Sequence, residues 1–185
     1  MTCATDALVL FSGGIDSTAC AHFLLGKGYR VSALFVDYGQ KAAKAESTAA
    51  KELSSMLGIT LQTMTLVGQQ SYGAGEITGR NAFLVFSAML GGFCVGTGSI
   101  ALGIHSGTPY YDCTPAFVSA IDRLVGEYTD GRRRVIAPFL LFTKRDILHY
   151  YIKQGLPLEK AYSCEAGEIP PCGTCLSCLD RKQSA

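Results

Sequence analysis

The chain has 185 residues, a length typical of one globular domain with a substantial hydrophobic core. Hydrophobic residues make up 48% of the sequence and charged residues only 17%, which excludes intrinsic disorder. Sixteen Lys and Arg against fifteen Asp and Glu give a formal net charge of +1, so no field of one sign exists to attract nucleic acid or an anionic membrane. We therefore expect a small-molecule substrate, no direct nucleic-acid partner and no membrane.

Apolar runs bounded by glycine or polar residues alternate along the chain with stretches in which apolar residues recur at helical spacing. In chain order we predict a strand at 7–11, a helix at 17–26, a strand at 31–36, a helix at 41–57, a strand at 59–66, a helix at 81–93, a strand at 99–104, a helix at 115–126, a strand at 134–138 and a helix at 144–154. This alternation predicts an α/β fold, in which five parallel strands form a sheet with helices on both faces. Such folds bind ligands beyond the carboxyl ends of the strands.

Residues 82–104 carry no charge and form a stretch long enough to cross a membrane. Five glycines interrupt the stretch and neither end carries Trp or Tyr, so we predict a buried helix followed by a buried strand. The first 25 residues contain no Lys or Arg and show no secretory leader. We therefore expect a cytoplasmic protein whose eight cysteines are reduced.

The segment Ser12-Gly13-Gly14-Ile15-Asp16-Ser17 connects the first predicted strand to the first predicted helix. A glycine turn of this kind points backbone N–H groups and the positive end of a helix at one place, where an anion can approach closely. The segment predicts a phosphate site, although it matches neither the P-loop pattern nor G-x-G-x-x-G. The alternative is an ordinary tight turn in which Asp16 or Ser17 caps the helix.

Four cysteines near the end of the chain, Cys164, Cys172, Cys175 and Cys178, follow the spacing C-x7-C-x2-C-x2-C. Four thiolates at such intervals can surround one Zn²⁺ ion, and a closed site of this kind is structural because it has no open position for substrate water. The alternative is an iron–sulfur cluster, since C-x2-C-x2-C also opens ferredoxin-type sequences. The Cys-Pro that follows in those sequences is absent at Leu179.

The glycine turn resembles the pyrophosphate loop of the N-type ATP pyrophosphatases, which cleave ATP between its α and β phosphates. Further matches are Phe35-Val36-Asp37-Tyr38-Gly39-Gln40, Gly79-Arg80-Asn81, Asp112-Cys113 with Pro115 and Phe117, and the four cysteines with Ser163 and Pro171. Over nearly the whole chain these motifs are similar to those of the 7-cyano-7-deazaguanine synthase (QueC) family. The resemblance implies an adenine nucleotide alpha-hydrolase-like (HUP) domain over 1–160, with a zinc-binding tail over 161–185 packed on it. It also implies one structural Zn²⁺ ion per chain and a homodimer.

By the same resemblance, ATP lies over the glycine turn with its adenine against the second strand near 34–36, and Mg²⁺ accompanies it. The residues implied in nucleotide binding are Phe11, Ser12, Gly13, Gly14, Ile15, Asp16, Ser17, Thr18, Asp37 and Lys144. Asp16 faces the Mg²⁺ and the triphosphate, and Lys144 reaches the phosphates, so these two are the candidate catalytic residues. The alternatives are a solvated Lys144 in the first turn of a helix, and an Asp37 that caps the helix after it.

The activity implied by the resemblance is an ATP-dependent ligase reaction of queuosine biosynthesis. It converts 7-carboxy-7-deazaguanine and ammonia to 7-cyano-7-deazaguanine through an acyl-adenylate and an amide. Arg80 and Asn81 are candidate substrate residues, because an arginine there can clamp a carboxylate or phosphate. Tyr111, Asp112 and Phe117 are the candidate ring pocket, since an aromatic face stacks on a heterocycle and a carboxylate accepts from an amino-pyrimidinone edge.

The sequence departs from the family near the expected substrate pocket. Thr114 and Ala116 stand where the family usually carries Arg and Glu, Ala42 stands where His is common, and the connections 66–79 and 105–112 are short. Three other functions therefore remain alternatives: a paralogue that joins the activated acid to another amine, for example on a protein in antiviral defence, a tRNA sulfur-transfer enzyme with an iron–sulfur cluster, and a non-enzymatic zinc module. We interpret His105 as an ordinary polar strand end.

Overall fold

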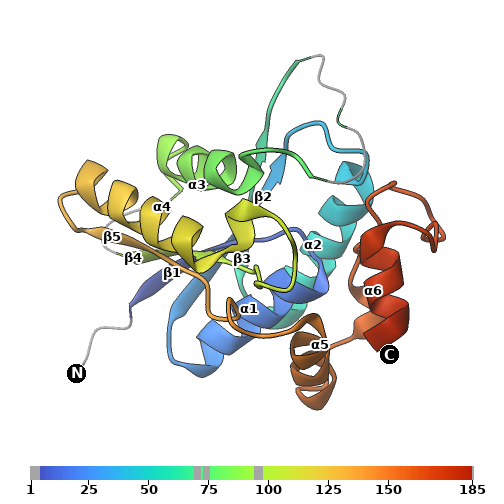
Figure 1. The fold of residues 1–185 in the computed structure, drawn as a ribbon. Helices are drawn as coiled ribbons and strands as arrows, with labels where there is room; N and C mark the ends of the chain where they lie inside the picture. Colours follow the sequence, from blue (N-terminus) through green and yellow to red (C-terminus); the bar gives the residue numbers. More distant parts are fainter. Residues whose placement is uncertain (1–4, 69–71, 73–75, 94–97, 185) are drawn as a thin grey trace.

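A computed structural model of the chain describes residues 5–68, 72, 76–93 and 98–184. Its centre is a five-stranded parallel sheet with the strand order β3-β2-β1-β4-β5. The strands are β1 (Asp6–Leu10), β2 (Arg30–Asp37), β3 (Thr60–Thr65), β4 (Gly98–Leu102) and β5 (Arg133–Ile136). The predicted α/β fold and its five parallel strands are confirmed (Figure 1). The strand order changes direction between β1 and β4, the position at which open α/β sheets bind ligands.

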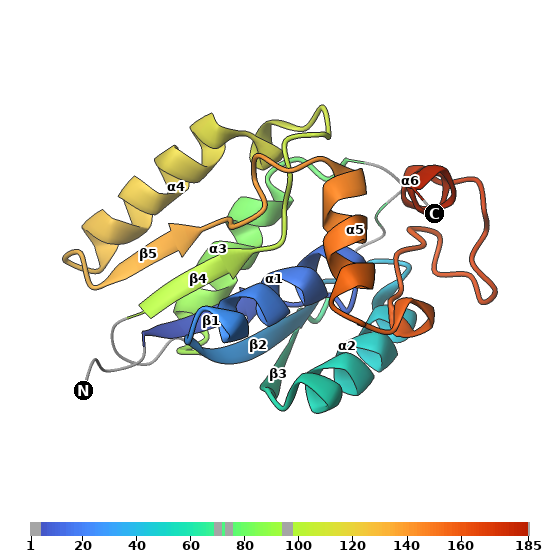
Figure 2. The same ribbon diagram turned by 90° about the horizontal axis from the view of Figure 1, so that it is seen from below.

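Helices cover both faces of the sheet (Figure 2). The described helices are α1 (Ile15–Gly26), α2 (Ala43–Leu57), α3 (Arg80–Leu90), α4 (Pro115–Tyr128), α5 (Lys144–Lys153) and α6 (Leu176–Ser184), with short 3₁₀ helices η1 (Tyr111–Cys113) and η2 (Leu158–Lys160). Helices α1, α2 and α5 share one hydrophobic core with the sheet, while α3 and α4 share the other.

Alternate side chains of the central strand β1 reach the two cores. Ala7 and Val9 lie in the core shared with α1, α2 and α5, whereas Leu8 and Leu10 lie in the core shared with α3 and α4. All four are buried, because a parallel sheet covered on both faces leaves neither side of a central strand to solvent. This double burial explains the continuous apolar run in the sequence.

The uncharged stretch 82–104 is divided between two elements, as predicted. Helix α3 ends at Leu90 and strand β4 begins at Gly98, while residues 94–97 lie outside the described part of the chain. None of the helices within the described ranges has the length and apolar character that crossing a membrane requires.

Helix α6 is absent from the predicted elements. Its sequence is short and mostly polar, and its two leucines, Leu176 and Leu179, are exposed, so no apolar periodicity indicates it. Contacts with other parts of the chain hold it in place. Arg181 donates hydrogen bonds to the carbonyl oxygen of Ala161 over 2.8 Å and to that of Leu158 over 2.6 Å.

The residues after 160 pack on the domain formed by the preceding ones. Tyr162 N donates a hydrogen bond to Gly13 O over 3.1 Å, which connects this tail to the glycine turn. Gly167, with a φ of +75°, lies so close to the Lys41 carbonyl that a Cβ atom would collide with it. These contacts support the packing expected of a tail over 161–185, and the boundary at 160 stays a prediction.

Candidate functional site

The glycine turn between β1 and α1 packs tightly against two neighbouring elements. Gly13 has a φ of +75°, and a Cβ atom there would lie 2.5 Å from the backbone N of Ala50 in α2. A Cβ atom on Gly103, which follows β4, would lie 2.7 Å from the Cα of Ser17. Because only glycine fits both positions, these two residues let the amino end of α1 lie against β4 and α2.

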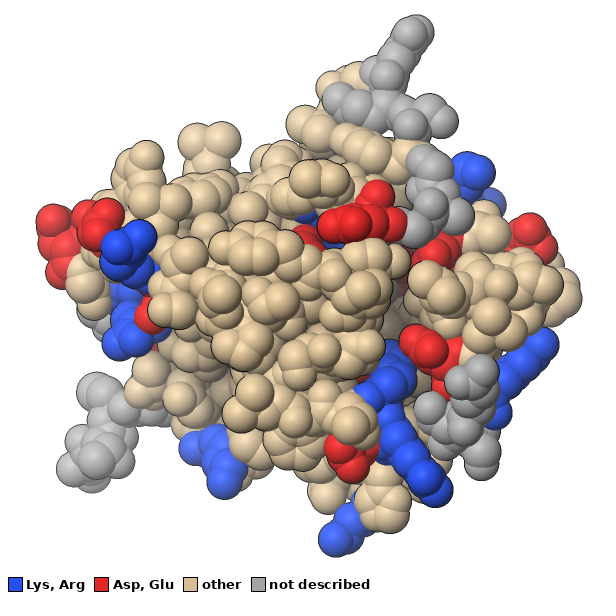
Figure 3. All heavy atoms as spheres, viewed as in Figure 1, with Lys and Arg blue, Asp and Glu red and all other residues tan. Residues whose placement is uncertain are grey.

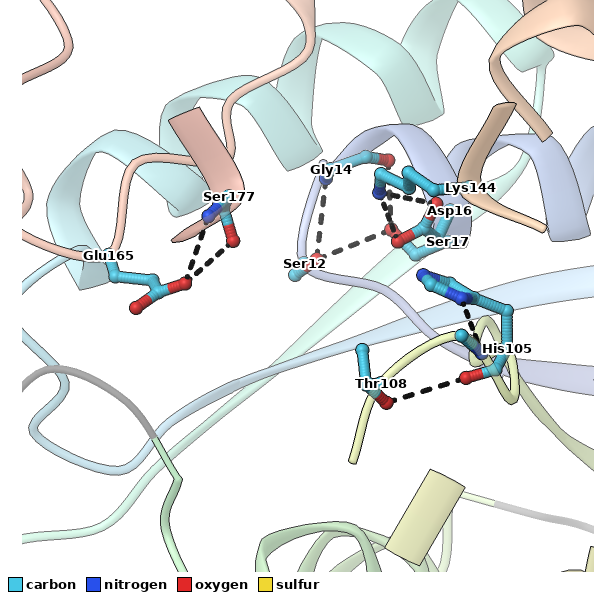
Figure 4. A network of polar contacts seen from close by, with 10 residues as sticks. Ser12, Gly14, Asp16, Ser17, His105, Thr108, Lys144, Glu165 and Ser177 are labelled. Carbon is cyan, nitrogen blue, oxygen red and sulfur yellow. Dashed lines mark hydrogen bonds and ion pairs between the residues drawn. The ribbon is translucent and has the colours of Figure 1, made fainter. Parts of the chain in front are cut away.

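The side chains of the glycine turn bond within the turn, and none of them caps the start of α1. Gly14 N donates to Ser12 Oγ over 3.3 Å, and Ser17 Oγ donates to Gly14 O over 3.2 Å (Figure 4). Gly14 is the N-cap residue, and no side chain accepts from the first N–H groups of the helix. The interpretation in which Asp16 or Ser17 caps the helix is therefore wrong. Uncapped N–H groups at a helix start are the arrangement that binds an anion.

Asp16 and Lys144 form an ion pair beside this turn. Lys144 Nζ lies 2.7 Å from Asp16 Oδ1 and 2.6 Å from Asp16 Oδ2 (Figure 4). Thr143 and Asp146 form a capping box that begins α5 at Lys144. The Lys144 side chain is only 21% exposed, so the interpretation as a solvated lysine is wrong. The two candidate catalytic residues are thus in contact, with Asp16 at the start of α1 and Lys144 at the start of α5.

His105 lies next to this ion pair, after β4. The residue is buried, and its Nδ1 accepts a hydrogen bond from Gly107 N over 3.2 Å (Figure 4). Burial lowers the pKa of His105; the charge of Lys144 acts in the same direction and that of Asp16 opposes it. The environment therefore favours a neutral imidazole, and the interpretation of His105 as an ordinary strand end misses its place in the site.

A cavity of about 470 Å³ lies over these groups, at the carboxyl ends of β1, β2 and β4. The predicted residues that line it are Phe11, Ser12, Gly14, Ile15, Asp16, Ser17, Arg80, Asn81 and Lys144. The segment 34–36, where we expect the adenine to lie, lines it as well. Its size and the mixture of apolar and charged side chains are typical of a small-molecule site.

Other predicted residues lie outside the cavity lining. Gly13 contacts α2, and Thr18 is fully buried in α1. Asp37 Oδ1 accepts a hydrogen bond from Gly39 N over 3.0 Å in the turn after β2. The N-cap residue of α2 is Ala42, so the interpretation of Asp37 as a helix cap is wrong.

The three predicted ring-pocket residues do not line the cavity. Asp112 Oδ2 accepts a hydrogen bond from Asn81 N over 3.1 Å, and Asn81 Nδ2 donates to Asp112 O over 3.0 Å. Phe117 is buried in the core of α3 and α4, and Tyr111, 62% exposed, packs edge-to-face on the Phe117 ring. The cavity meets this part of the chain at Tyr110 and Cys113 instead. Asp112 therefore positions Asn81 from outside the cavity.

The turn after β2 and the first turn of α2 bring two polar side chains, Gln40 and Glu46, to the cavity. Gln40 Oε1 accepts from Tyr38 N over 2.9 Å, and Gln40 Nε2 donates to Glu46 Oε2 over 2.9 Å. Burial raises the pKa of Glu46, while Gln40 and the nearby Arg80 act in the opposite direction. The Asp-Tyr-Gly-Gln motif marks Gln40 in the sequence. The signal for Glu46 is weaker: a carboxylate between the buried alanines 45 and 49 on the inner side of α2.

The cysteine-bearing tail forms another wall of the cavity. Its lining residues are Tyr162, Ser163, Glu165, Leu176, Ser177 and Asp180. Glu165 Oε1 accepts from Ser177 Oγ over 2.7 Å and from Ser177 N over 3.3 Å (Figure 4). These bonds connect the two tail segments that line the cavity, 162–165 and 176–180. Ser163 belongs to a family motif, but no sequence signal indicates that these residues form a wall, because the wall depends on how the tail folds back over the domain.

The four cysteines of the predicted metal site lie together. Their sulfur atoms are all within 4.8 Å of one another, so the cluster can hold a metal ion. Backbone N–H groups of Thr174 and Cys175 lower the pKa of the Cys172 thiol to about 6, and burial raises the pKa of Cys178 to about 12. N–H groups directed at a thiolate are a favourable environment for a metal ligand.

Charged side chains lie mainly at the margins of the face shown in Figure 3. The broad middle of that face, over α3 and α4, is largely uncharged.

Comparison with known proteins identifies related sequences along the whole chain. The family model described as "Queuosine biosynthesis protein QueC" matches residues 6–77 and 65–185. A 7-cyano-7-deazaguanine synthase from Aquifex aeolicus is 31% identical over 209 residues, which cover 96% of this chain and 94% of the relative. One from Archaeoglobus fulgidus is 32% identical over 204 residues, which cover 96% of this chain and 84% of the relative.

Two solved structures share the fold. A predicted subunit of tRNA methyltransferase from Methanocaldococcus jannaschii gives a TM-score of 0.51 at 17% identity, covering 86% of this chain and 92% of its own. The U34-tRNA thiolase NcsA from Methanococcus maripaludis, solved with its 4Fe–4S cluster, gives 0.52 at 15% identity, covering 97% of this chain and 64% of its own. At such identities these structures establish the fold alone.

Proposed function

We propose that this chain, which belongs to the QueC family of queuosine biosynthesis proteins, is a ligase that uses ATP to convert 7-carboxy-7-deazaguanine and ammonia to 7-cyano-7-deazaguanine. The name shared by its relatives supports the product, and the substrate is the one that the family resemblance implies. The observation that carries the proposal is the Asp16–Lys144 pair at the uncapped start of α1, inside a cavity of small-molecule size.

In the first step, a carboxylate oxygen of the substrate attacks the α-phosphorus of ATP. The bond from that phosphorus to the bridging oxygen breaks, pyrophosphate leaves, and an acyl-adenylate forms. Positioning and charge neutralisation are the main contributions that a protein makes to such a transfer. Lys144 Nζ and the N–H groups of the glycine turn supply positive charge to the phosphates, and Asp16 holds Lys144 in place before ATP binds.

In the second step, ammonia attacks the acyl carbon, AMP leaves, and loss of one proton gives the amide. The amide oxygen then attacks the α-phosphorus of a second ATP, and pyrophosphate leaves again. Departure of AMP and loss of both protons from the nitrogen of the activated amide form the nitrile. The same phosphate site serves both activations, so the proposed mechanism needs only one nucleotide pocket.

Two metal ions belong to the proposal. Asp16 is the cavity carboxylate that would hold Mg²⁺ beside the phosphates, where the ion adds further charge neutralisation. The four cysteines would hold one structural Zn²⁺ ion. Ligands at about 2.3 Å around a tetrahedral zinc lie about 3.8 Å apart. The Sγ atoms of Cys172 and Cys178 are 4.0 Å apart, whereas an iron–sulfur cluster places several atoms between its ligands and needs a wider site.

The test is incubation of zinc-loaded protein with 7-carboxy-7-deazaguanine, ammonium, Mg²⁺ and ATP, followed by mass spectrometry of the small molecules. We expect the amide first and then the nitrile, with two AMP released per nitrile. Protein that releases neither AMP nor an amide or nitrile product would contradict the proposal. The homodimer and the cytoplasmic location implied by the family remain predictions, which gel filtration and fractionation can check.

A second candidate keeps the adenylation and replaces ammonia by another amine. The departures from the family motif at Thr114 and Ala116 are the reason to consider it. Thr114 Oγ1 accepts from Phe117 N at the start of α4, Ala116 is exposed, and neither lines the cavity. The departures therefore leave the cavity wall unchanged, and ammonia stays the first choice. Intact mass spectrometry of candidate protein acceptors separates the two functions. A tRNA sulfur-transfer enzyme would instead contain iron and absorb visible light.

A further inference from the structure

Carboxylate side chains line the cavity, and one of them neither belongs to the tail nor has a task in the nucleotide chemistry proposed above. Asp16 pairs with Lys144, and Glu165 accepts from Ser177. Asp180 lies on α6, close enough to His105 to raise the pKa of the imidazole. Glu46 remains, and it shares the cavity with Arg80 and with aromatic and apolar side chains, namely Tyr38, Leu84, Tyr110 and Cys113.

Glu46 is held in place by one of its two carboxylate oxygens. Gln40 Nε2 donates to Oε2 over 2.9 Å and also to Val36 O over 3.2 Å, so the amide connects the carboxylate to the end of β2. The other oxygen, Oε1, accepts no hydrogen bond from any residue in the described ranges. The carboxylate is thus fixed by its protein neighbours and still has acceptor sites for a ligand.

The arrangement matches one edge of a guanine-type ring. In order along the ring, that edge presents two adjacent N–H donors, the 2-amino group and N1, and then the carbonyl oxygen O6. A carboxylate accepts from both donors, and Arg80, near enough to affect the pKa of Glu46, can donate to the carbonyl. The corresponding edge of adenine has one donor beside an acceptor nitrogen, which repels a carboxylate.

We infer that Glu46, with Arg80 beside it, binds the amino-pyrimidinone edge of the deazaguanine and thereby selects the substrate ring. This inference rests on the proposed function, and it assigns to Glu46 the role that the sequence analysis predicts for Asp112. Asp112 is engaged elsewhere, because its Oδ2 accepts from Asn81 N. The aromatic Tyr38 and Tyr110 line the same cavity and provide ring faces for stacking.

The test compares two heterocycles, 7-deazaguanine and 7-deazahypoxanthine, which differ only in the 2-amino group. Their dissociation constants, and that of ATP, are measured by calorimetry on the wild type and on Glu46→Gln. A glutamine directs either an NH₂ group or only one acceptor oxygen at the two ring donors, so we expect the preference for the 2-amino ring to fall at least about tenfold. ATP binding changes little.

Two matched variants sharpen the result. Glu52→Gln makes the same change on an exposed part of α2, and Asp112→Asn makes it at the residue that the sequence favours. We expect both to keep the wild-type ring preference, although Asp112→Asn lowers the melting temperature. The inference is overturned if Glu46→Gln keeps the preference, if it weakens ATP as much as the ring, or if Asp112→Asn alone removes the preference.

The failure of this inference differs from the failure of the proposed function. Wild-type protein that forms the amide or nitrile, while Glu46→Gln keeps its ring preference, overturns only the role of Glu46. Wild-type protein that binds neither heterocycle and releases no AMP with the carboxylate overturns both.

Discussion

The glycine turn and the cysteine tail face the same cavity, but different forces hold them in place. The turn is fixed by close backbone packing, in which Gly13 and Gly103 allow α1 to lie against α2 and β4. The tail buries few apolar side chains and exposes others, such as Ile169, which is 80% exposed. Because a segment of this kind gains little from apolar burial, its order must come chiefly from a metal ion and a few hydrogen bonds. The residues proposed for phosphate chemistry therefore belong to the domain, and the tail completes the cavity around them.

The largest expected effect follows from Lys144→Ala, which removes the cation that the domain places beside the glycine turn. We expect AMP release to fall by about 10²- to 10³-fold, because a preorganised charge near the transferring phosphoryl group is lost. Zinc content and the melting temperature should change little, since the hydrogen bonds of Lys144 Nζ go to Asp16 and none reaches the described residues of the tail. Metal analysis and AMP-release kinetics measure both quantities. Lys153→Ala, at the other end of α5, is the control, and equal losses in the two variants would contradict the role of Lys144.

The second prediction removes the metal from the tail. Cys175→Ser should lose zinc and lower turnover by about 5- to 150-fold, the usual range for energetic coupling between two sites. ATP binding should weaken less, because the glycine turn keeps its own packing against α2 and β4. Metal analysis, ATP calorimetry and AMP-release kinetics test the comparison, and chelated wild-type protein serves as the control. Full zinc occupancy with normal turnover would refute the ligand assignment.

The sequence predicts the domain better than the tail, for a physical reason. Local patterns determine the strands and the glycine turn: a buried parallel strand needs a continuous apolar run, and Gly13 needs a positive φ. The spacing of the cysteines likewise predicts their cluster. The wall formed by Tyr162, Glu165 and Asp180 depends on contacts between distant segments, and no local pattern encodes those.

Glu46 and Asp112 show the same limit within one site. Both are carboxylates near motif residues, and the sequence favours Asp112 because it belongs to a family motif. The structure directs Asp112 toward Asn81 and leaves Glu46 at the cavity. Which of two carboxylates faces a ligand depends on side-chain direction, and spacing alone does not determine it.

A smaller effect is expected from two helix caps. Thr143 caps α5 at the site by accepting from Asp146 N, and Thr114 caps α4 away from the cavity lining by accepting from Phe117 N. Each change to alanine should cost about 1 kcal/mol of the free energy of unfolding, because one N–H group at a helix start loses its acceptor. Only Thr143→Ala should also slow AMP release, since it loosens the turn that carries Lys144. Urea denaturation and kinetics measure the two effects, and equal slowing by Thr114→Ala would remove the distinction.

The smallest expected effect is a pH dependence of the free energy of unfolding, which comes from His105 in the domain part of the cavity. Burial lowers the pKa of His105 below its ordinary value of 6.5, so below that pH the unfolded chain binds a proton that the folded chain resists. Stability from this group is therefore complete above pH 6.5 and is lost as the pH falls through the lowered pKa, at no more than about 1.4 kcal/mol per pH unit. We expect wild-type protein to lose more stability than His105→Gln between pH 7.5 and 5.5 in urea denaturation, whatever the variant costs at pH 7.5. Protonation of the zinc ligands occurs in both proteins and cancels in the difference. An equal loss in the two proteins would show that His105 does not resist protonation and that the imidazole next to Asp16 and Lys144 is solvated.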